Sequence, residues 1–386
     1  MTETAFPDMT EIQKRLVIER DAPEAIAQII TSEPNPRIFV SISRSLAKNS
    51  PITKDLQSRL RTKIVGVGSI LREHTPYDKV FELAREISRL KATHLLSIGG
   101  GSVIDGGKIA LLVANLKIKD AEELEAINYG SGKDLGITSW PIQHIAVPTT
   151  LSGAEFTPIA GATSSITGRK TGFAHTALVP DYIVLSSALS KYTPERLWLS
   201  TGIRAVDHAV ETICVPGVDI ESADFCAKGL KMLYQGMTAT RQNPEDLPPR
   251  ETSQLGVYYA TAGISRYRMG ASHGLGYLLG VIGHVPHGIT SCVFLPAVVT
   301  YNLPETKEAQ QQIAKVLDLQ TAEEVGPALR DFIGRLGLPN RLSALDISTE
   351  TLDEIKSGAL THPVVQANPK PIKTIEDVTQ IFNFSG

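Results

Sequence analysis

The sequence has few cysteines, few aromatic residues and little net charge, so nothing in its composition sets it apart from ordinary globular proteins. Three cysteines occur among 386 residues, aromatic residues make up 6%, and the net charge is only -3 at pH 7. Because Cys214, Cys226 and Cys292 are odd in number and widely spaced, we expect buried free thiols and a reducing compartment. The near-neutral charge argues against nucleic acid as a partner, since that interface needs a basic face.

Long apolar runs are missing as well. No stretch reaches the roughly 18 consecutive apolar residues that a membrane-spanning helix requires, so we expect no membrane partner. The opening MTETAFPDMTEIQKRL lacks the basic segment followed by an apolar one that marks a secretory signal. Together with the cysteine content, this predicts a cytoplasmic protein.

Short apolar runs rich in β-branched residues alternate with helical spacing in the first half of the chain. This alternation predicts βαβ units and a parallel sheet. The predicted strands are residues 37–42, 63–67, 93–98, 144–147 and 182–185, and residues 79–90 have helical spacing.

The pattern changes near residue 188, because helical spacing dominates from there on, as in 221–236 and 308–319. We therefore predict an α/β domain over residues 1–188, with a doubly wound, mostly parallel sheet that binds a dinucleotide. An all-helical domain over residues 189–386 would carry the substrate or metal site.

The segment GGGSVIDGGK comes directly after the predicted strand at 93–98 and opens a helical stretch. Gly99, Gly100 and Gly101 allow a tight turn and a close approach to a ligand. Free N–H groups behind Ser102 at a helix N-terminus favour a pyrophosphate, with Asp105 nearby. A plain glycine turn with Ser102 as N-cap would leave the same pattern. The ordinary GxGxxG fingerprint is absent.

A second polar cluster, PTTLSGAE, comes after the strand at 144–147. Thr149, Thr150 and Ser152 then lie at the carboxyl end of a parallel strand, where doubly wound sheets bind ligands. A turn whose hydroxyl groups cap a helix explains the cluster equally well.

Five segments in order resemble the iron-containing alcohol dehydrogenase superfamily, which shares its fold with dehydroquinate synthase. They are GGGSVIDGGK at 99–108, PTTLSGAEFTP at 148–158, GIRAVDHAVE at 202–211, HGLGYLLGVIGHVPHG at 273–288 and NPKPI at 368–372. The resemblance spans essentially the whole chain and implies an oxidoreductase that uses NADH, NADPH or both.

Within the superfamily, the chain is most similar to maleylacetate reductases. The segments 157–161, 168–171 and 74–76 resemble theirs, and the chain lacks an aspartate ligand where it has Arg204. In metal-dependent members that aspartate precedes the histidine matched by His208 by one helical turn.

The resemblance places metal ligands at His208, His273 and His287. Arg204 is always protonated and has no lone pair to offer, so it cannot be a ligand and would repel a cation. On helical spacing, Asp207 faces another side of the helix. We therefore expect no catalytic metal; iron or zinc, if present, would be held by the three histidines.

The resemblance and Arg204 together suggest reduction of an anionic enone such as maleylacetate to 3-oxoadipate. Arginine suits carboxylates and a developing enolate. We assign catalysis to Arg204, His208, His273 and His287, where histidines can donate a proton. Further substrate contacts are assigned to Lys170, Tyr277 and His74. Arg204 in a surface or interdomain salt bridge is the alternative.

Cofactor choice depends on the residues directly after the first predicted strand. Enzymes that select NADH commonly have an acid there, which repels a 2′-phosphate. This chain has Ser43 and Arg44 instead, and Arg44 can pair with a phosphate or simply face solvent. We expect both NADH and NADPH to be accepted.

Other functions stay open on sequence grounds. They are a metal-dependent alcohol dehydrogenase or aldehyde reductase, a non-redox lyase, and a family member that acts in secondary metabolism. We expect the partners to be a small anionic substrate and a second copy of the chain in a homodimer.

Overall fold

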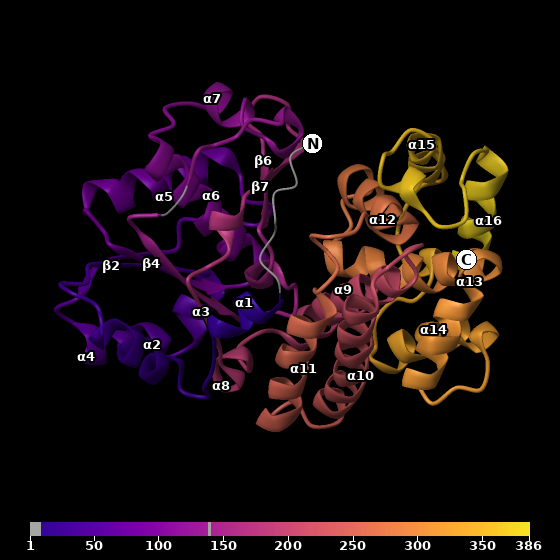
Figure 1. The fold of residues 1–386 in the computed structure, drawn as a ribbon, viewed down its shortest axis with the longest axis horizontal. Helices are drawn as coiled ribbons and strands as arrows, with labels where there is room; N and C mark the ends of the chain where they lie inside the picture. Colours follow the sequence, from indigo (N-terminus) through magenta and orange to yellow (C-terminus); the bar gives the residue numbers. More distant parts are fainter. Residues whose placement is uncertain (1–8, 138–139) are drawn as a thin grey trace. The chain divides into compact units, whose positions relative to one another are not determined.

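The computed structural model describes residues 9–137 and 140–386 (Figure 1). The chain divides into two compact units, Met1–Thr193 and Pro194–Gly386. The sequence places the boundary at residue 188. The first eight residues of the opening stretch, on which the expectation of no secretory signal depends, lie outside the described residues.

A six-stranded sheet forms the centre of the first unit. Its strands, in the order β1-β8-β5-β4-β2-β3, are paired in parallel throughout, which confirms the predicted sheet. The strands are β1 (Leu16–Ile18), β2 (Ile38–Ile42), β3 (Ile64–Gly68), β4 (His94–Gly99), β5 (Gln143–Pro148) and β8 (Tyr182–Leu185). Strand β1 has three residues and was not predicted.

Helices cover both faces of this sheet, as the alternating side chains of β4 require. Leu95 packs in a core with α5 (Tyr77–Arg89) and α6 (Gly101–Leu116). Its neighbours Leu96 and Ile98 point the other way, into a core with α2 (Ala22–Thr31) and α4 (Ile52–Leu60). In Figure 1 these two pairs of helices lie on opposite sides of β2 and β4.

An antiparallel hairpin of β6 (Ile159–Thr163) and β7 (Lys170–Ala174) stands apart from the main sheet. It was not predicted, because its glycines and threonines give no apolar alternation. The other helices of this unit are α1 (Met9–Lys14), α3 (Arg44–Asn49), α7 (Ala121–Glu125) and α8 (Ser187–Ser190).

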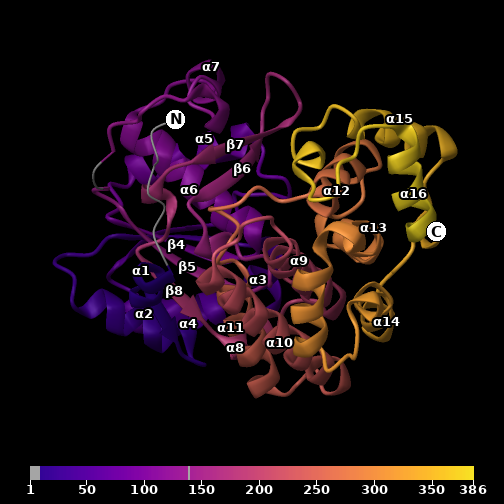
Figure 2. The ribbon, with the colours of Figure 1, turned by 45° about the vertical axis from the view of Figure 1, so that its right-hand side comes forward.

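The regular elements of the second unit are all helices, as predicted (Figure 2). They are α9 (Glu195–Ile213), α10 (Ile220–Gln242), α11 (Leu247–Ala260), α12 (Ala271–Ile282), α13 (His287–Val316), α14 (Val325–Arg335), α15 (Thr349–Ala359) and α16 (Ile375–Ser385), with short 3-10 turns between some of them. Helices α10 and α11 pack closely because Gly229 has no Cβ; one there would lie 2.4 Å from the backbone nitrogen of Ala260.

One expectation from composition is confirmed. Cys214, Cys226 and Cys292 are free and buried. Among the described helices, none combines the length and the apolar character needed to cross a bilayer.

Candidate functional site

The strand order of the first unit reverses between β2 and β4. The chain continues from β2 to β3 on one side and from β4 to β5 on the other, and ligands bind at the carboxyl ends of strands at such a point. Backbone hydrogen bonds join the three loops there: Ser43 N donates to Ile98 O at 3.0 Å, and Thr149 N donates to Gly99 O at 2.9 Å. The fold therefore brings together predicted cofactor residues that lie far apart in the sequence.

The glycine loop enters α6 at this edge, and two close approaches explain its composition. A Cβ on Gly100 would lie 3.0 Å from Cγ2 of Thr150, and one on Gly101 would lie 2.9 Å from Oγ of Ser152. Gly100 is the N-cap and offers no side-chain cap, so reading Ser102 as the N-cap was wrong. The first N–H groups of the helix therefore stay available for an anion.

Lys108, which the sequence patterns did not single out, anchors the second loop. Its buried Nζ donates to the carbonyl oxygens of Ala154 at 2.5 Å, Thr157 at 2.7 Å and Ile159 at 3.0 Å. Burial lowers the pKa of Lys108 to about 8. One turn earlier, Asp105 Oδ2 accepts from Gly161 N at 3.1 Å. The signal was a lysine directly before the apolar run IALLVA of the same helix.

The segment at 74–76 is tied to the same helix. His74 and Thr75 are consecutive non-glycine residues in the left-handed region, with φ of 61° and 51°. Thr75 Oγ1 donates to Ser102 O at 3.2 Å, and Thr163 Oγ1 donates to His74 O at 2.8 Å. This strained backbone is therefore held between α6 and β6.

Lys170 and His74, predicted to contact substrate, belong to the first unit, whereas Arg204 and Tyr277 belong to the second. Lys170 begins β7 and crosses Gly161, where a Cβ would lie 2.4 Å from its Cε. Arg44 is exposed at the first position of α3. A substrate site that includes His74, Lys170, Arg204 and Tyr277 stays a prediction.

The second unit has a buried polar centre built around Arg204. The Arg204 side chain is 13% exposed, and its Nη1 donates to Ser291 Oγ at 3.1 Å and lies 3.5 Å from Asp207 Oδ2. The expectation that Asp207 faces away was wrong, because residues three apart on a helix are neighbours and the long arginine side chain reaches across. Reading Arg204 as a surface salt bridge was wrong too, since its partner Asp207 is fully buried and Arg204 itself is only 13% exposed.

Asp207 joins three helices through one oxygen. Oδ2 accepts from Ser291 Oγ on α13 at 2.6 Å and from Ser272 Oγ on α12 at 2.9 Å. Its other oxygen, Oδ1, is buried and has no hydrogen-bond partner in the structure.

Glu211, one turn further along α9, was also missed. Its carboxylate accepts from Gly270 N at 2.8 Å, Ser272 N at 2.8 Å and His273 Nδ1 at 2.7 Å. Burial raises the pKa of Glu211 to about 7, although these backbone N–H groups oppose the rise. The signal was a carboxylate at helical spacing from Arg204, Asp207 and His208, which places it on the same helix face.

Two histidines of the centre present unpaired atoms. The rings of His208 and His273 lie 5.1 Å apart, and His208 Nδ1 and His273 Nε2 are buried without a hydrogen-bond partner. Burial lowers the pKa of His208 far below its usual value and that of His273 to about 3, so both rings are neutral at pH 7. Unpaired buried polar atoms on adjacent rings are typical of a site that binds a polar ligand.

The other two predicted residues lie on the same helices. His287 is exposed at the start of α13, and its charge is one cause of the low pKa of His208. Tyr277 lies one turn after His273 on α12 and packs against His362, with 5.3 Å between ring centroids.

Iron or zinc, which the resemblance implies, does not fit these residues. Among the described residues, the potential ligands within 4.8 Å of one another are Asp207, Glu211 and His273, and the three histidines do not converge in this way. The cationic Arg204 lies 3.5 Å from Asp207, where it would repel a metal ion.

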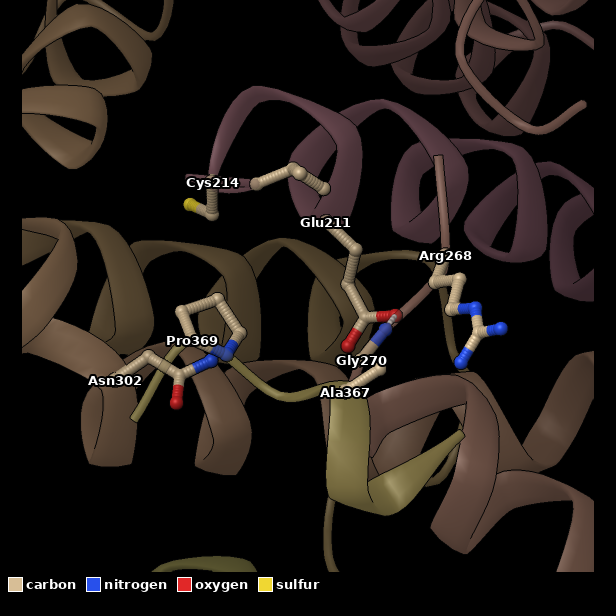
Figure 3. A pocket seen from close by; sticks show the side chains of 8 residues that line it. Glu211, Cys214, Arg268, Gly270, Asn302, Ala367 and Pro369 are labelled. Carbon is tan, nitrogen blue, oxygen red and sulfur yellow. Dashed lines mark hydrogen bonds between the residues drawn. The ribbon is translucent and has the colours of Figure 1, made fainter. Parts of the chain in front are cut away.

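A small cavity lies beside Glu211. Its volume of about 10 Å³ holds about one water molecule. In Figure 3 the Glu211 side chain extends from α9 toward Gly270, with Cys214 and Asn302 on one side and Arg268 on the other.

Comparisons with known proteins agree with this architecture. The family model "Iron-containing alcohol dehydrogenase" matches residues 13–187, and "Fe-containing alcohol dehydrogenase family, C-terminal" matches residues 198–385. The chain therefore belongs to the iron-containing alcohol dehydrogenase family and is an oxidoreductase.

Two relatives and one solved structure are similar to this chain over most of its length. The chain is 32% identical to Dehydrogenase ALT3 of Alternaria alternata over 371 residues, which cover 86% of this chain and 94% of the relative. It is 27% identical to the maleylacetate reductase of Burkholderia cepacia, covering 81% and 80%. The maleylacetate reductase structure from Agrobacterium tumefaciens has a TM-score of 0.80 at 24% identity, covers 99% and 96%, and shows the same fold.

The glycine loop gives the first testable prediction. The Gly100→Val variant should bind NADH at least about tenfold more weakly, because its side chain would meet Thr150 and occupy the space that a pyrophosphate needs. Fluorescence titration with NADH measures this. Gly172→Ala is the control, since a Cβ there meets nothing within 4 Å. Equal affinity in all three proteins would remove the loop from the cofactor site.

The second prediction concerns cofactor choice. Because Ser43 and Arg44 come after β2 where an acid would repel a 2′-phosphate, NADPH should be used with an efficiency within about a hundredfold of that for NADH. Steady-state titrations of both cofactors at one ionic strength test it. A larger preference for NADH would mean that another acid excludes the phosphate.

Proposed function

We propose that this oxidoreductase uses NADH or NADPH to reduce a small anionic enone such as maleylacetate, giving 3-oxoadipate. The observation that carries the proposal is the partly buried Arg204, which stands where the resemblance places a metal ligand and is held by Ser291 and Asp207. The similarity to maleylacetate reductases supports the same substrate class.

The first unit has what a dinucleotide needs. The glycine loop leaves room for a pyrophosphate at the start of α6, while Thr150 and Ser152 flank it from the loop after β5. Bound NADH or NADPH would supply the hydride.

Arg204 is suited to an anionic substrate because only one of its nitrogens is occupied. Nη1 bonds to Ser291 and Asp207, whereas Nε and Nη2 make no hydrogen bond with the described residues. A guanidinium held on one side presents its remaining donors in a fixed orientation, as a carboxylate or an enolate oxygen requires.

The reaction needs one hydride and one proton. The hydride forms a C–H bond at the alkene carbon farther from the ketone, and the π electrons move to the ketone oxygen as an enolate. The enolate then takes a proton at the other alkene carbon, which gives the saturated ketone. The proton comes from solvent, and His208 is suited to relay it: its ring is neutral and makes no hydrogen bond with a described residue, so one ring nitrogen can give up its proton while the other takes one from water.

A metal-dependent alcohol dehydrogenase is less well supported. Its Lewis acid would have to bind beside the partly buried cation Arg204, which lies 3.5 Å from Asp207.

The third prediction tests the substrate. Maleylacetate should cause consumption of NADH, followed at the cofactor's absorbance. Arg204→Met should lower kcat/KM by about 10- to 100-fold, since hydrogen bonds to a charged group contribute roughly 1.5–3 kcal/mol. Arg196→Met, at an exposed position of the same helix, is the control. Turnover of simple aldehydes with none of maleylacetate would overturn the proposal.

The fourth prediction tests the metal. Activity should survive a chelator. Arg204→Asp, by contrast, should be destabilised, because it places a second carboxylate one turn from the buried Asp207, and zinc should restore its melting temperature. Thermal melts with and without zinc compare the two proteins. Stoichiometric iron or zinc in the unmodified enzyme, with activity that depends on it, would contradict the idea.

A further inference from the structure

The carboxylate of Glu211 meets three N–H donors at one point of the fold. Both of its oxygens are used: Oε1 accepts from Ser272 N, and Oε2 accepts from Gly270 N and from Nδ1 of His273. Glu211 is 7% exposed and lies on α9, whereas its three partners lie at the start of α12. One side chain therefore fixes both the first turn of α12 and the ring of His273.

We infer that Glu211 is a positioning residue, which holds His273 as the tautomer protonated on Nδ1 and so presents the lone pair of Nε2 to the ligand. An ionised carboxylate can only accept, so the ring nitrogen that faces it must carry the proton. The other ring nitrogen, Nε2, is the buried atom that has no partner in the structure. It is therefore fixed as an acceptor.

Capping of α12 alone does not account for a buried acid. The neighbouring N–H of Ala271 is satisfied by a neutral amide, because Asn368 Oδ1 accepts from it at 3.0 Å. A carboxylate is costly to bury, and an amide serves the same helix turn one residue away. The contact that an amide cannot reproduce without giving up another is the bond from His273 Nδ1, because glutamine has only one acceptor oxygen for three donors.

The geometry leaves Glu211 little freedom. A Cβ on Gly270 would lie 3.0 Å from Glu211 Oε1 and 2.9 Å from Asn368 Oδ1, so the backbone of α12 closes directly over the carboxylate. The cavity of about 10 Å³ also borders the Glu211 side chain and leaves room for about one water molecule beside it (Figure 3). A carboxylate packed in this way keeps the ring of His273 in one orientation.

For the proposed reduction, on which this consequence depends, the two histidines then have different roles. His273 accepts a hydrogen bond through Nε2, and His208, which has no such partner, is the neutral ring that can relay a proton from solvent. Without Glu211, the nearest carboxylate oxygen left for Nδ1 would be Asp207 Oδ2 at 3.5 Å, which is too far for a normal hydrogen bond and holds the tautomer and the ring orientation less firmly than Glu211 at 2.7 Å.

The test is the tautomer itself. In protein labelled with ¹⁵N-histidine and measured at pH 8, the His273 signal should show a proton on Nδ1 and none on Nε2, because the Glu211 carboxylate accepts from Nδ1. In Glu211→Gln it should change to a mixture of tautomers, and kcat should fall by about 10- to 100-fold with little change in KM, as is typical when a group that orients a histidine is lost.

Asn368→Ala is the matched control. It removes the neighbouring cap of α12 but leaves the bond between Glu211 and His273, so it should lower the melting temperature and keep the tautomer of the unmodified protein. If His273 keeps its proton on Nδ1 in Glu211→Gln, or if Asn368→Ala changes the tautomer equally, the inference is wrong. The NMR measurement needs no substrate, so its outcome is independent of whether maleylacetate is turned over.

Discussion

The second unit depends on a single buried oxygen, Oδ2 of Asp207, at which α9, α12 and α13 meet. It accepts from Ser272 and Ser291 and lies beside the guanidinium of Arg204. Removing one partner of a buried ion pair leaves an uncompensated charge, which costs about 3–5 kcal/mol. Arg204 therefore requires Asp207 as its charge partner, and Ser272 and Ser291 hold Asp207 in place through their hydrogen bonds.

In the first unit, the backbone N–H groups at the start of α6 have no side-chain cap, and yet the loops around them are held firmly. Gly100 caps α6 without a side chain, so the loop alone would be loosely held. Lys108 compensates from inside the same helix by binding three carbonyl oxygens of the neighbouring loop. Because the buried ammonium group binds three acceptors, it fixes the loop after β5, and this loop flanks the N–H groups that are open to an anion.

The sequence predicted the fold well, because strands such as 93–98 and the helices around them carry strong periodic patterns. It also found Arg204, His208 and His273, whose spacing resembles a known family. It missed the supporting residues Lys108 and Glu211, since their partners are backbone groups 46 or more positions away in the chain. It misplaced Asp207 because helical spacing gives the direction of the Cβ, not the reach of a long neighbouring side chain. The short strand β1 and the hairpin of β6 and β7 gave too weak a pattern.

The unpaired atoms of the polar centre have an energetic consequence for the resting enzyme. Asp207 Oδ1, His208 Nδ1 and His273 Nε2 are buried and unsatisfied, and each such atom costs about 1–3 kcal/mol. The net free energy of unfolding of a protein is only about 5–15 kcal/mol, so these three atoms lower it by a substantial fraction while they keep polar atoms available to a ligand. Replacing these groups by apolar ones would make the helical unit more stable, so selection for activity and selection for stability act in opposite directions at this site.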